Sequence, residues 1–358
     1  MTGDRPIIVV GCPRSGTTLL QVMLHAHPRI AIPPENRFVV PAYRARRRFG
    51  DLNDPENRRK LANWIVTDKK TKFADFKLDG NEVIEQVVAA PPTLGSALAA
   101  VFQAYARRFG KPRWGDKRPA YALQLEVIRA LFPSAQIVNI VRDGRDCVAS
   151  LKEMSWYEHD LVHAVSTWAR CVDLMRRAAR ELPSDSFYEL IYEDLVADPE
   201  RELRSLCDFL GEEYDPAMAE PATTAKVAVP KRKRHHARTR GPVTTARAGT
   251  WRQRLEPEEI SLCEAVLGDR LRSYGYELSG APSPPLGLRL RYRWKFFRRR
   301  FPVRQLVLEA ADRMRRLPPV AAVPSEAAVP PMSSTEHSAP AVPVSSSRQA
   351  RPAPRAGR

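Results

Sequence analysis

The sequence lacks the features that mark several protein classes. Its five cysteines are dispersed and odd in number, and no Cys-x-x-Cys pair occurs, which predicts reduced thiols rather than a disulfide framework or a zinc site. Carboxylates and histidines form no metal-ligand pattern, so we expect no metal. No stretch approaches the ~18 apolar residues of a membrane-spanning helix. The apolar run after Pro6 is too short for a signal peptide, and we therefore expect a cytoplasmic protein.

Positive charge is abundant but unevenly distributed. The 358 residues carry a formal net charge of +17. Residues 281–358 hold 15 Lys or Arg against 4 Asp or Glu, a net +11, so the first 280 residues carry only about +6. We expect a globular domain over 1–280 that handles an anionic ligand, a basic, helix-compatible extension over 281–317, and a disordered tail rich in Pro, Ala and Ser over 318–358.

Apolar periodicity predicts an α/β fold. Three runs rich in β-branched residues, 7–11, 137–141 and 187–192, are typical of buried strands. Helical spacing is found in six segments: 17–27, 98–109, 121–132, 161–181, 200–210 and 257–276. This alternation predicts a three-layer fold of the P-loop type, with a mostly parallel sheet, helices on both faces and ligands at the carboxyl ends of the strands. Residues 40–95 are mixed and charged, and we expect a helical insertion or lid there.

The segment Gly11–Thr18 follows the first predicted strand and has the spacing of a phosphate-binding loop. Gly11 and Gly16 allow the backbone close to a ligand, and two hydroxyls then occupy the first helical turn, where free N–H groups attract anions. A nucleoside-triphosphate loop has Lys before its Ser or Thr, but this chain has Thr17-Thr18. Arg14 is the nearest cation, so the sequence favours a phosphate-type ligand over an ordinary ATPase or GTPase.

A second candidate phosphate site follows the strand at 137–141. Arg142 leaves that strand at its carboxyl end, and a helix that begins at Asp143 or Gly144 would place Ser150 about two turns along it. Arg supplies a bidentate fork for phosphate, and Ser supplies a hydroxyl donor. The alternative is a surface Arg-Asp pair at a strand-to-helix turn, and this segment alone does not decide between the two.

Together, the two segments resemble the sulfotransferase family that uses 3′-phosphoadenylyl sulfate (PAPS). The loop Pro13–Thr18 is similar to the family's loop for the 5′-phosphosulfate. Arg142 and Ser150 match its 3′-phosphate pair, with the same eight-residue separation. The paired motifs occur in the family's order, and the resemblance covers roughly residues 5–279. It implies the same α/β fold.

Within that family, the chain is most similar to the tyrosylprotein sulfotransferase and related bacterial branch. Three elements of the branch follow the loop in order: Met-Leu at 23–24, Ala-His-Pro at 26–28 and Glu-x-Arg at 35–37. The resemblance assigns contacts with the donor nucleotide to ten residues: Pro13, Arg14, Ser15, Gly16, Thr17, Thr18, Arg142, Ser150, Tyr192 and Arg252.

The resemblance also assigns three catalytic residues. Glu35 occupies the position of the branch's general base, and Lys117 matches the family's Gly-Asp-Lys element. Lys117 and Arg14 would stabilise the sulfuryl group and the leaving phosphate. The alternatives are a solvated loop carboxylate and an exposed lysine before a turn. His25 and His27 are rival bases, although His27, in Ala-His-Pro, also suits a turn.

Two of the nucleotide contacts rest on partial matches. Tyr192 matches a family tyrosine near the adenosine, and an aromatic side chain at a strand end explains it as well. Arg252 ends a Gly-Thr-Trp-Arg element similar to the family's late Gly-x-Trp-Lys/Arg, which closes over the nucleotide. The residues upstream of Gly249 depart from the family pattern.

The resemblance implies transfer of a sulfuryl group from PAPS to a hydroxyl acceptor, with release of 3′-phosphoadenosine 5′-phosphate and without a metal. The acceptor class stays open among a protein tyrosine, a carbohydrate, a lipid and a small phenol. The basic run 231–240 suits an anionic acceptor, and a solvated loop explains it as well. One alternative is a P-loop nucleotide kinase-like enzyme. Another is a non-catalytic nucleotide-fold module that docks on anionic lipid or RNA through the Arg-rich segment 286–317. For the enzyme we expect no specific nucleic acid, and this segment would place it at the periphery of an anionic membrane.

Overall fold

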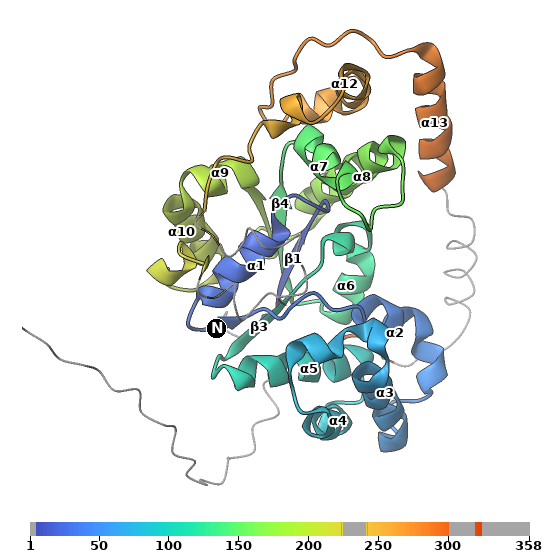
Figure 1. Cartoon of the computed structure of the whole chain (residues 1–358). Coiled ribbons are helices and arrows are strands. Elements are labelled where there is room, and N and C mark those ends of the chain that lie inside the picture. Colours follow the sequence, from blue (N-terminus) through green and yellow to red (C-terminus); the bar gives the residue numbers. More distant parts are fainter. Residues whose placement is uncertain (1–4, 223, 225–240, 242, 301–318, 324–358) are drawn as a thin grey trace, which may run out of the picture. The chain divides into compact units, whose positions relative to one another are not determined.

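The computed structural model describes residues 5–222, 224, 241, 243–300 and 319–323 (Figure 1). All of them belong to one compact unit, Met1–Pro324. The basic run 231–240, residues 301–318 and most of the predicted disordered tail lie outside the described residues. Within the described ranges, no helix is long and apolar enough to cross a bilayer, and no three His, Cys, Asp or Glu side chains form a group that could hold a metal ion.

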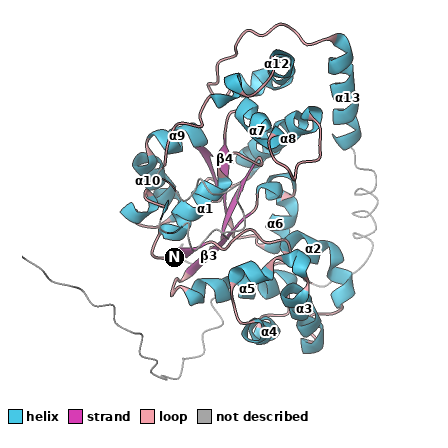
Figure 2. Cartoon of the chain, viewed as in Figure 1, coloured by secondary structure: helices cyan, strands magenta, loops and turns pink. Residues whose placement is uncertain are grey.

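Five parallel strands form the central sheet in the order β2-β3-β1-β4-β5. The strands are drawn in magenta, with helices around them, in Figure 2. Their bounds are β1 Ile7–Gly11, β2 Ile30–Ala31, β3 Arg113–Lys117, β4 Gln136–Val141 and β5 Phe187–Ile191. The three strands predicted from the sequence are β1, β4 and β5. The predicted parallel α/β fold is therefore confirmed.

β2 and β3 are not among the strands predicted from the sequence. β3 has the polar sequence Arg-Trp-Gly-Asp-Lys, yet all five of its residues are buried. Its first side chain, Arg113, donates to the carbonyls of Arg5 at 3.0 Å and Leu210 at 2.8 Å and pairs with Glu212 at 3.1 Å. A strand with satisfied polar groups can be buried without an apolar run, so periodicity does not detect it.

Helices connect and flank the strands. Their bounds are α1 Thr17–Ala26, α2 Val39–Ala45, α3 Pro55–Thr67, α4 Gly80–Ala89, α5 Leu94–Arg108, α6 Leu125–Leu131, α7 Gly144–Lys152, α8 Leu161–Glu181, α9 Tyr192–Ala197, α10 Pro199–Leu210, α12 Pro257–Arg272 and α13 Leu286–Arg300. The insertion at 40–95 is helical, as predicted. The helix predicted over 121–132 is instead a 3₁₀ turn, Pro119–Leu123, followed by α6.

Alternate residues of β1 face opposite sides of the sheet. Ile8 and Val10 pack in a core with residues of α5, α6, α7 and α8, whereas Ile7 and Val9 pack in a second core with residues of α1, α9 and α10. All four side chains are fully buried, and burial of each contributes roughly 1.5–3 kcal/mol. Helices thus cover both faces of the sheet, as the predicted three layers require (Figure 1).

A short stretch of the C-terminal region packs against the start of α5. The N–H of Gly95 donates to the carbonyl of Val320 at 2.8 Å, and the N–H of Ala322 donates to the carbonyl of Leu131 at 2.7 Å. A Cβ atom on Gly95 would lie 2.3 Å from the Leu131 carbonyl oxygen and 2.4 Å from the nitrogen of Ala322. Residues 319–323, within the segment expected to be disordered, therefore have a defined place because α5 offers unpaired N–H groups and a glycine there.

Replacement of Gly95 by Ala tests this packing. The added methyl group collides with backbone atoms on two sides, so we expect Gly95→Ala to lower the free energy of unfolding by about 1–3 kcal/mol. Gly268→Ala in α12 is the matched control, because its Cβ meets only ordinary contacts. We expect that variant to be unchanged or stabilised by up to about 1 kcal/mol. Equal urea midpoints for the two variants would contradict the packing.

Candidate active site

The parallel register brings three segments to one edge of the sheet. β1 lies between β3 and β4, with Val9 paired to Lys117 and Gly11 paired to Ile140. Because the strands run in the same direction, their carboxyl ends lie together. The loop after β1, Lys117 at the end of β3 and Arg142 just beyond β4 therefore share that edge.

The loop between β1 and α1 takes a left-handed backbone conformation at two positions. Arg14 has a φ of 76° and Gly16 a φ of 100°. A Cβ atom on Gly16 would lie 2.5 Å from Cδ2 of Tyr192, so only glycine fits both the backbone and the space. Positive φ at a non-glycine residue costs about 1 kcal/mol or more and is concentrated in functional loops. α1 then begins at Thr17, and its first turn carries N–H groups that have no intrahelical partner and can bind an anion.

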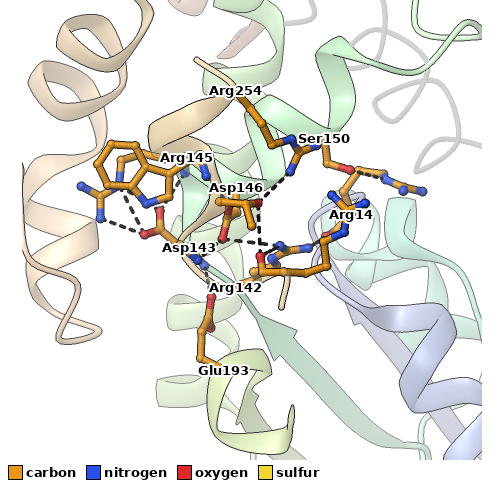
Figure 3. Close-up of polar contacts among 12 residues, drawn as sticks. Arg14, Arg142, Asp143, Arg145, Asp146, Ser150, Glu193 and Arg254 are labelled. Carbon is orange, nitrogen blue, oxygen red and sulfur yellow. Dashed lines mark hydrogen bonds and ion pairs between the residues drawn. The ribbon is translucent and has the colours of Figure 1, made fainter. Parts of the chain in front are cut away.

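The two predicted phosphate sites meet through Arg14 (Figure 3). Nε of Arg14 donates to Oγ of Ser150 at 2.9 Å, and Nη1 of Arg142 donates to the carbonyl of Arg14 at 3.3 Å. The sequence predicts Arg14 at the 5′ end of the nucleotide and Ser150 at its 3′ end. In the folded chain the backbone of Arg14 belongs to the first loop, while its side chain reaches the second site.

Arg142 is buried among groups that hold its guanidinium in place. It lies over the ring of Tyr192 at 4.5 Å, pairs with Asp146 at 3.4 Å and donates to the carbonyl of Arg247. Nε of Arg142 and the hydroxyl of buried Ser15 are without a hydrogen-bond partner in the described part of the chain. A phosphate group at each of the two predicted sites would offer an acceptor to the atom there, so both residues fit a bound phosphate.

Asp146 organises this site and is not among the residues predicted from the sequence. Its carboxylate accepts hydrogen bonds from the N–H groups of Gly249 and Trp251, both at 2.8 Å, and from the hydroxyl of Thr250 at 3.1 Å. It thereby ties the late Gly-Thr-Trp segment to α7, beside Arg142. Its spacing of four residues from Arg142, a separation at which opposite charges often pair around helices, is the signal that could have identified it.

Among the described residues, Arg252 takes no part in the hydrogen bonds that join Arg14, Arg142 and Ser150. Its side chain is exposed, and its guanidinium lies over the ring of Trp251 at 4.4 Å. Trp251 itself is buried. The contact of Arg252 with the nucleotide stays a prediction.

Lys117 contacts Glu35, another of the three predicted catalytic residues. Its Nζ is 3.3 Å from Oε2 of Glu35 and donates to Oγ1 of Thr18, also at 3.3 Å. The side chain of Lys117 is 2% exposed and that of Glu35 is 26% exposed. The carboxylate can therefore meet a molecule from solvent while the ammonium group stays covered. Neither residue is a solvated surface group, and their chemical roles stay predictions.

The buried carboxylate of Asp116 holds the segments that carry Glu35 and Lys117 together. Asp116 accepts hydrogen bonds from Nδ2 of Asn36 at 2.8 Å, from the hydroxyl of Tyr121 at 2.7 Å and from the N–H of Lys117 at 2.8 Å. Burial raises the pKa of Asp116, although these three hydrogen bonds oppose the rise. Because Asn36 follows Glu35 and Asp116 precedes Lys117, the hydrogen bond between Asn36 and Asp116 holds the Glu35 carboxylate close to the Lys117 ammonium group. Neither bridging residue was predicted from the sequence.

α1 holds the segment that leads to Glu35. Nε2 of Gln21 donates to the carbonyl of Pro33 at 2.8 Å, and Nδ1 of His25 accepts from the N–H of Ile32 at 3.1 Å. Burial lowers the pKa of His25 to about 3. His27 contacts backbone groups through both ring nitrogens. Both rival bases thus have structural partners, and His25 lies about 10 Å along the helix from Thr18.

His25 should make stability depend on pH. Its pKa is 6.5 when unperturbed and about 3 in the fold. As the pH falls, the unfolded chain therefore binds a proton at His25 before the folded chain does. Stability is then full above about pH 6.5 and falls toward pH 3, by at most about 1.4 kcal/mol per pH unit. His25→Asn keeps the acceptor for Ile32 but cannot titrate, and we expect a flatter profile in urea unfolding between about pH 7 and pH 4. His159→Asn, at an exposed histidine, is the control. An unchanged profile in His25→Asn would contradict the buried neutral imidazole.

Comparisons with known proteins agree with this geometry. The profile of the sulfotransferase family matches residues 6–216. A protein-tyrosine sulfotransferase of Drosophila melanogaster is 26% identical over 223 residues, which are 60% of this chain and 40% of that protein. Protein-tyrosine sulfotransferase 1 of Danio rerio is 26% identical over 78% of this chain and 74% of its own length. The chain thus spans well under half of the Drosophila relative.

A solved structure has the same fold. The sulfotransferase domain from the olefin synthase of Synechococcus PCC 7002 is 25% identical, with a TM-score of 0.53. The alignment covers 77% of this chain and 96% of that domain. With a family profile matched over more than half of its length, the chain belongs to the sulfotransferase family.

Proposed function

We propose that this protein transfers a sulfuryl group from PAPS to a hydroxyl acceptor and releases 3′-phosphoadenosine 5′-phosphate. The observation that carries the proposal is that one sheet edge holds three cations, Arg14 and Arg142 in contact with each other's segment and Lys117 paired with the partly exposed carboxylate of Glu35. Sulfuryl transfer from PAPS requires two phosphate-binding sites and a general base next to the site that holds the 5′-phosphosulfate.

The donor is bound by the two loops. Backbone N–H groups at the start of α1, with the hydroxyls of Ser15, Thr17 and Thr18, bind the 5′-phosphosulfate. Arg142 and Ser150 bind the 3′-phosphate, which supplies the acceptor missing at Nε of Arg142. Arg14 now donates to Ser150, so on binding, its side chain exchanges a neutral hydroxyl partner for an anionic one.

Glu35 and Lys117 have different roles in the transfer, the first toward the acceptor and the second toward the leaving phosphate. Glu35 takes the proton of the acceptor hydroxyl as that oxygen forms a bond to sulfur. The bond between sulfur and the bridging phosphate oxygen breaks, and its electron pair leaves with the phosphate. Lys117 stabilises that developing negative charge from a covered position, where the electrostatic effect is strong.

The acceptor that we favour is the phenol of a protein tyrosine. A phenol, with a pKa near 10, yields its proton to a carboxylate far more easily than an aliphatic alcohol does. Three relatives, from Drosophila melanogaster, Danio rerio and Homo sapiens, are named protein-tyrosine sulfotransferases. A carbohydrate, a lipid and a small phenol remain the competing acceptors, and assays with an isotopically labelled sulfuryl donor distinguish them.

Nucleotide preference tests the donor site. In calorimetric titrations we expect 3′-phosphoadenosine 5′-phosphate to bind more tightly than ATP. Ser150→Ala removes a hydrogen bond to a charged phosphate and should weaken that binding by roughly 10–100-fold, with little effect on adenosine 5′-monophosphate. Ser261→Ala in α12, whose hydroxyl bonds the carbonyl of Pro257, is the control. Preference for ATP would favour the nucleotide kinase-like alternative.

Glu35→Gln tests the base. The amide keeps the size of the side chain, so we expect nucleotide affinity near wild type and a loss of about 10²–10⁴ in turnover with a tyrosine peptide. Glu85→Gln in α4, an exposed carboxylate paired with Arg59 at 2.5 Å, is the matched control with full turnover. Full turnover in Glu35→Gln would remove Glu35 from this role.

A further inference from the structure

Helix α13 has one face fixed to the rest of the molecule. Tyr292 is buried, and the helix contacts α8. Arg291 and Lys295 both pair with Asp160, the residue that caps α8, Arg291 at 3.2 Å. These contacts hold one side of α13 against α8.

The opposite face of α13 is an exposed apolar stripe. Leu286, Leu290, Trp294 and Phe297 are 68%, 55%, 58% and 65% exposed. At 100° per residue they fall within one sector of the helix, roughly opposite Tyr292. Large apolar side chains that are exposed together, on a helix whose other face is fixed, mark an interaction surface.

The rim of this stripe is basic. Arg289, Arg291 and Arg293 are exposed, and the sequence of α13, LGLRLRYRWKFFRRR, contains no acidic residue. An apolar stripe of Leu and Trp or Phe with arginines beside it is the composition of helices that lie in a membrane interface. Each Arg near an anionic bilayer adds to the attraction.

We propose that the exposed face of α13 docks on an anionic lipid bilayer, with the helix in the plane of the interface. Leu286, Leu290, Trp294 and Phe297 enter the boundary between headgroups and acyl chains, and Arg289 and Arg293 contact phosphate and carboxylate groups. The aliphatic part of the stripe separates this partner from RNA, because single strands stack on aromatic side chains but gain little from exposed Leu. A second copy of the chain presents the same positive charge and is repelled at this face.

The surface is independent of the transfer site. None of the residues assigned to PAPS or to the acceptor lies on α13, so loss of lipid binding leaves the proposed activity intact, and failure of that activity leaves this surface unaffected.

The test is flotation of the full-length protein with phosphatidylcholine vesicles that contain or lack phosphatidylserine. We expect the protein to float only with the anionic vesicles and to be released by high salt. Arg289→Gln with Arg293→Gln should reduce the partition coefficient by about 30-fold, the effect of two surface charges. Arg201→Gln with Arg204→Gln in α10 removes the same charge from exposed residues elsewhere and should change partition little.

A second double variant measures what the apolar side chains contribute to vesicle binding. Trp294→Ala with Phe297→Ala keeps every charge and should reduce partition by roughly tenfold or more, with an unchanged circular dichroism spectrum. Partition equal to wild type in this variant, equal loss in the α10 control, or equal flotation with neutral vesicles would each overturn the proposal. Absence of flotation together with retention of a labelled single-stranded RNA would assign the face to nucleic acid instead.

Discussion

The parallel pairing of β1 with both β3 and β4 is the constraint on which the rest of the site depends. It places the end of a polar strand, a tight loop and a strand-to-helix turn at one edge, although Arg14 in the loop is more than a hundred residues from both Lys117 and Arg142 in the chain. None of these segments would bind an anion well alone. Brought together, they let Arg14 reach Ser150 and Arg142 reach the backbone of Arg14.

The second requirement is that buried charge be compensated. Lys117 is almost fully covered and pairs with Glu35, while Asp116 is covered and accepts three hydrogen bonds. Arg142 relies on Asp146 and the ring of Tyr192 in the same way. Networks of this kind hold side chains in place before a ligand arrives, so that little reorganisation accompanies the reaction.

The fold and much of the site were accessible from the sequence because their signals are local. Each signal lies within one short segment of the sequence, as do the apolar runs of β1 and β4 and the glycine spacing of the first loop. The bridge of Asn36, Asp116 and Tyr121 was not accessible, since it joins residues 80 positions apart whose types have no special spacing. β3 escaped prediction for a related reason, because its polar residues are satisfied by partners elsewhere in the chain. The roles of Glu35 and Arg252 still rest on resemblance.

The most direct test is a crystal structure of the full chain with 3′-phosphoadenosine 5′-phosphate. We predict the 3′-phosphate within hydrogen-bond distance of Ser150 and Arg142, and the 5′-phosphate at the N–H groups that open α1, next to Lys117. A nucleotide bound elsewhere, or one with its two phosphates exchanged between these sites, would contradict the account.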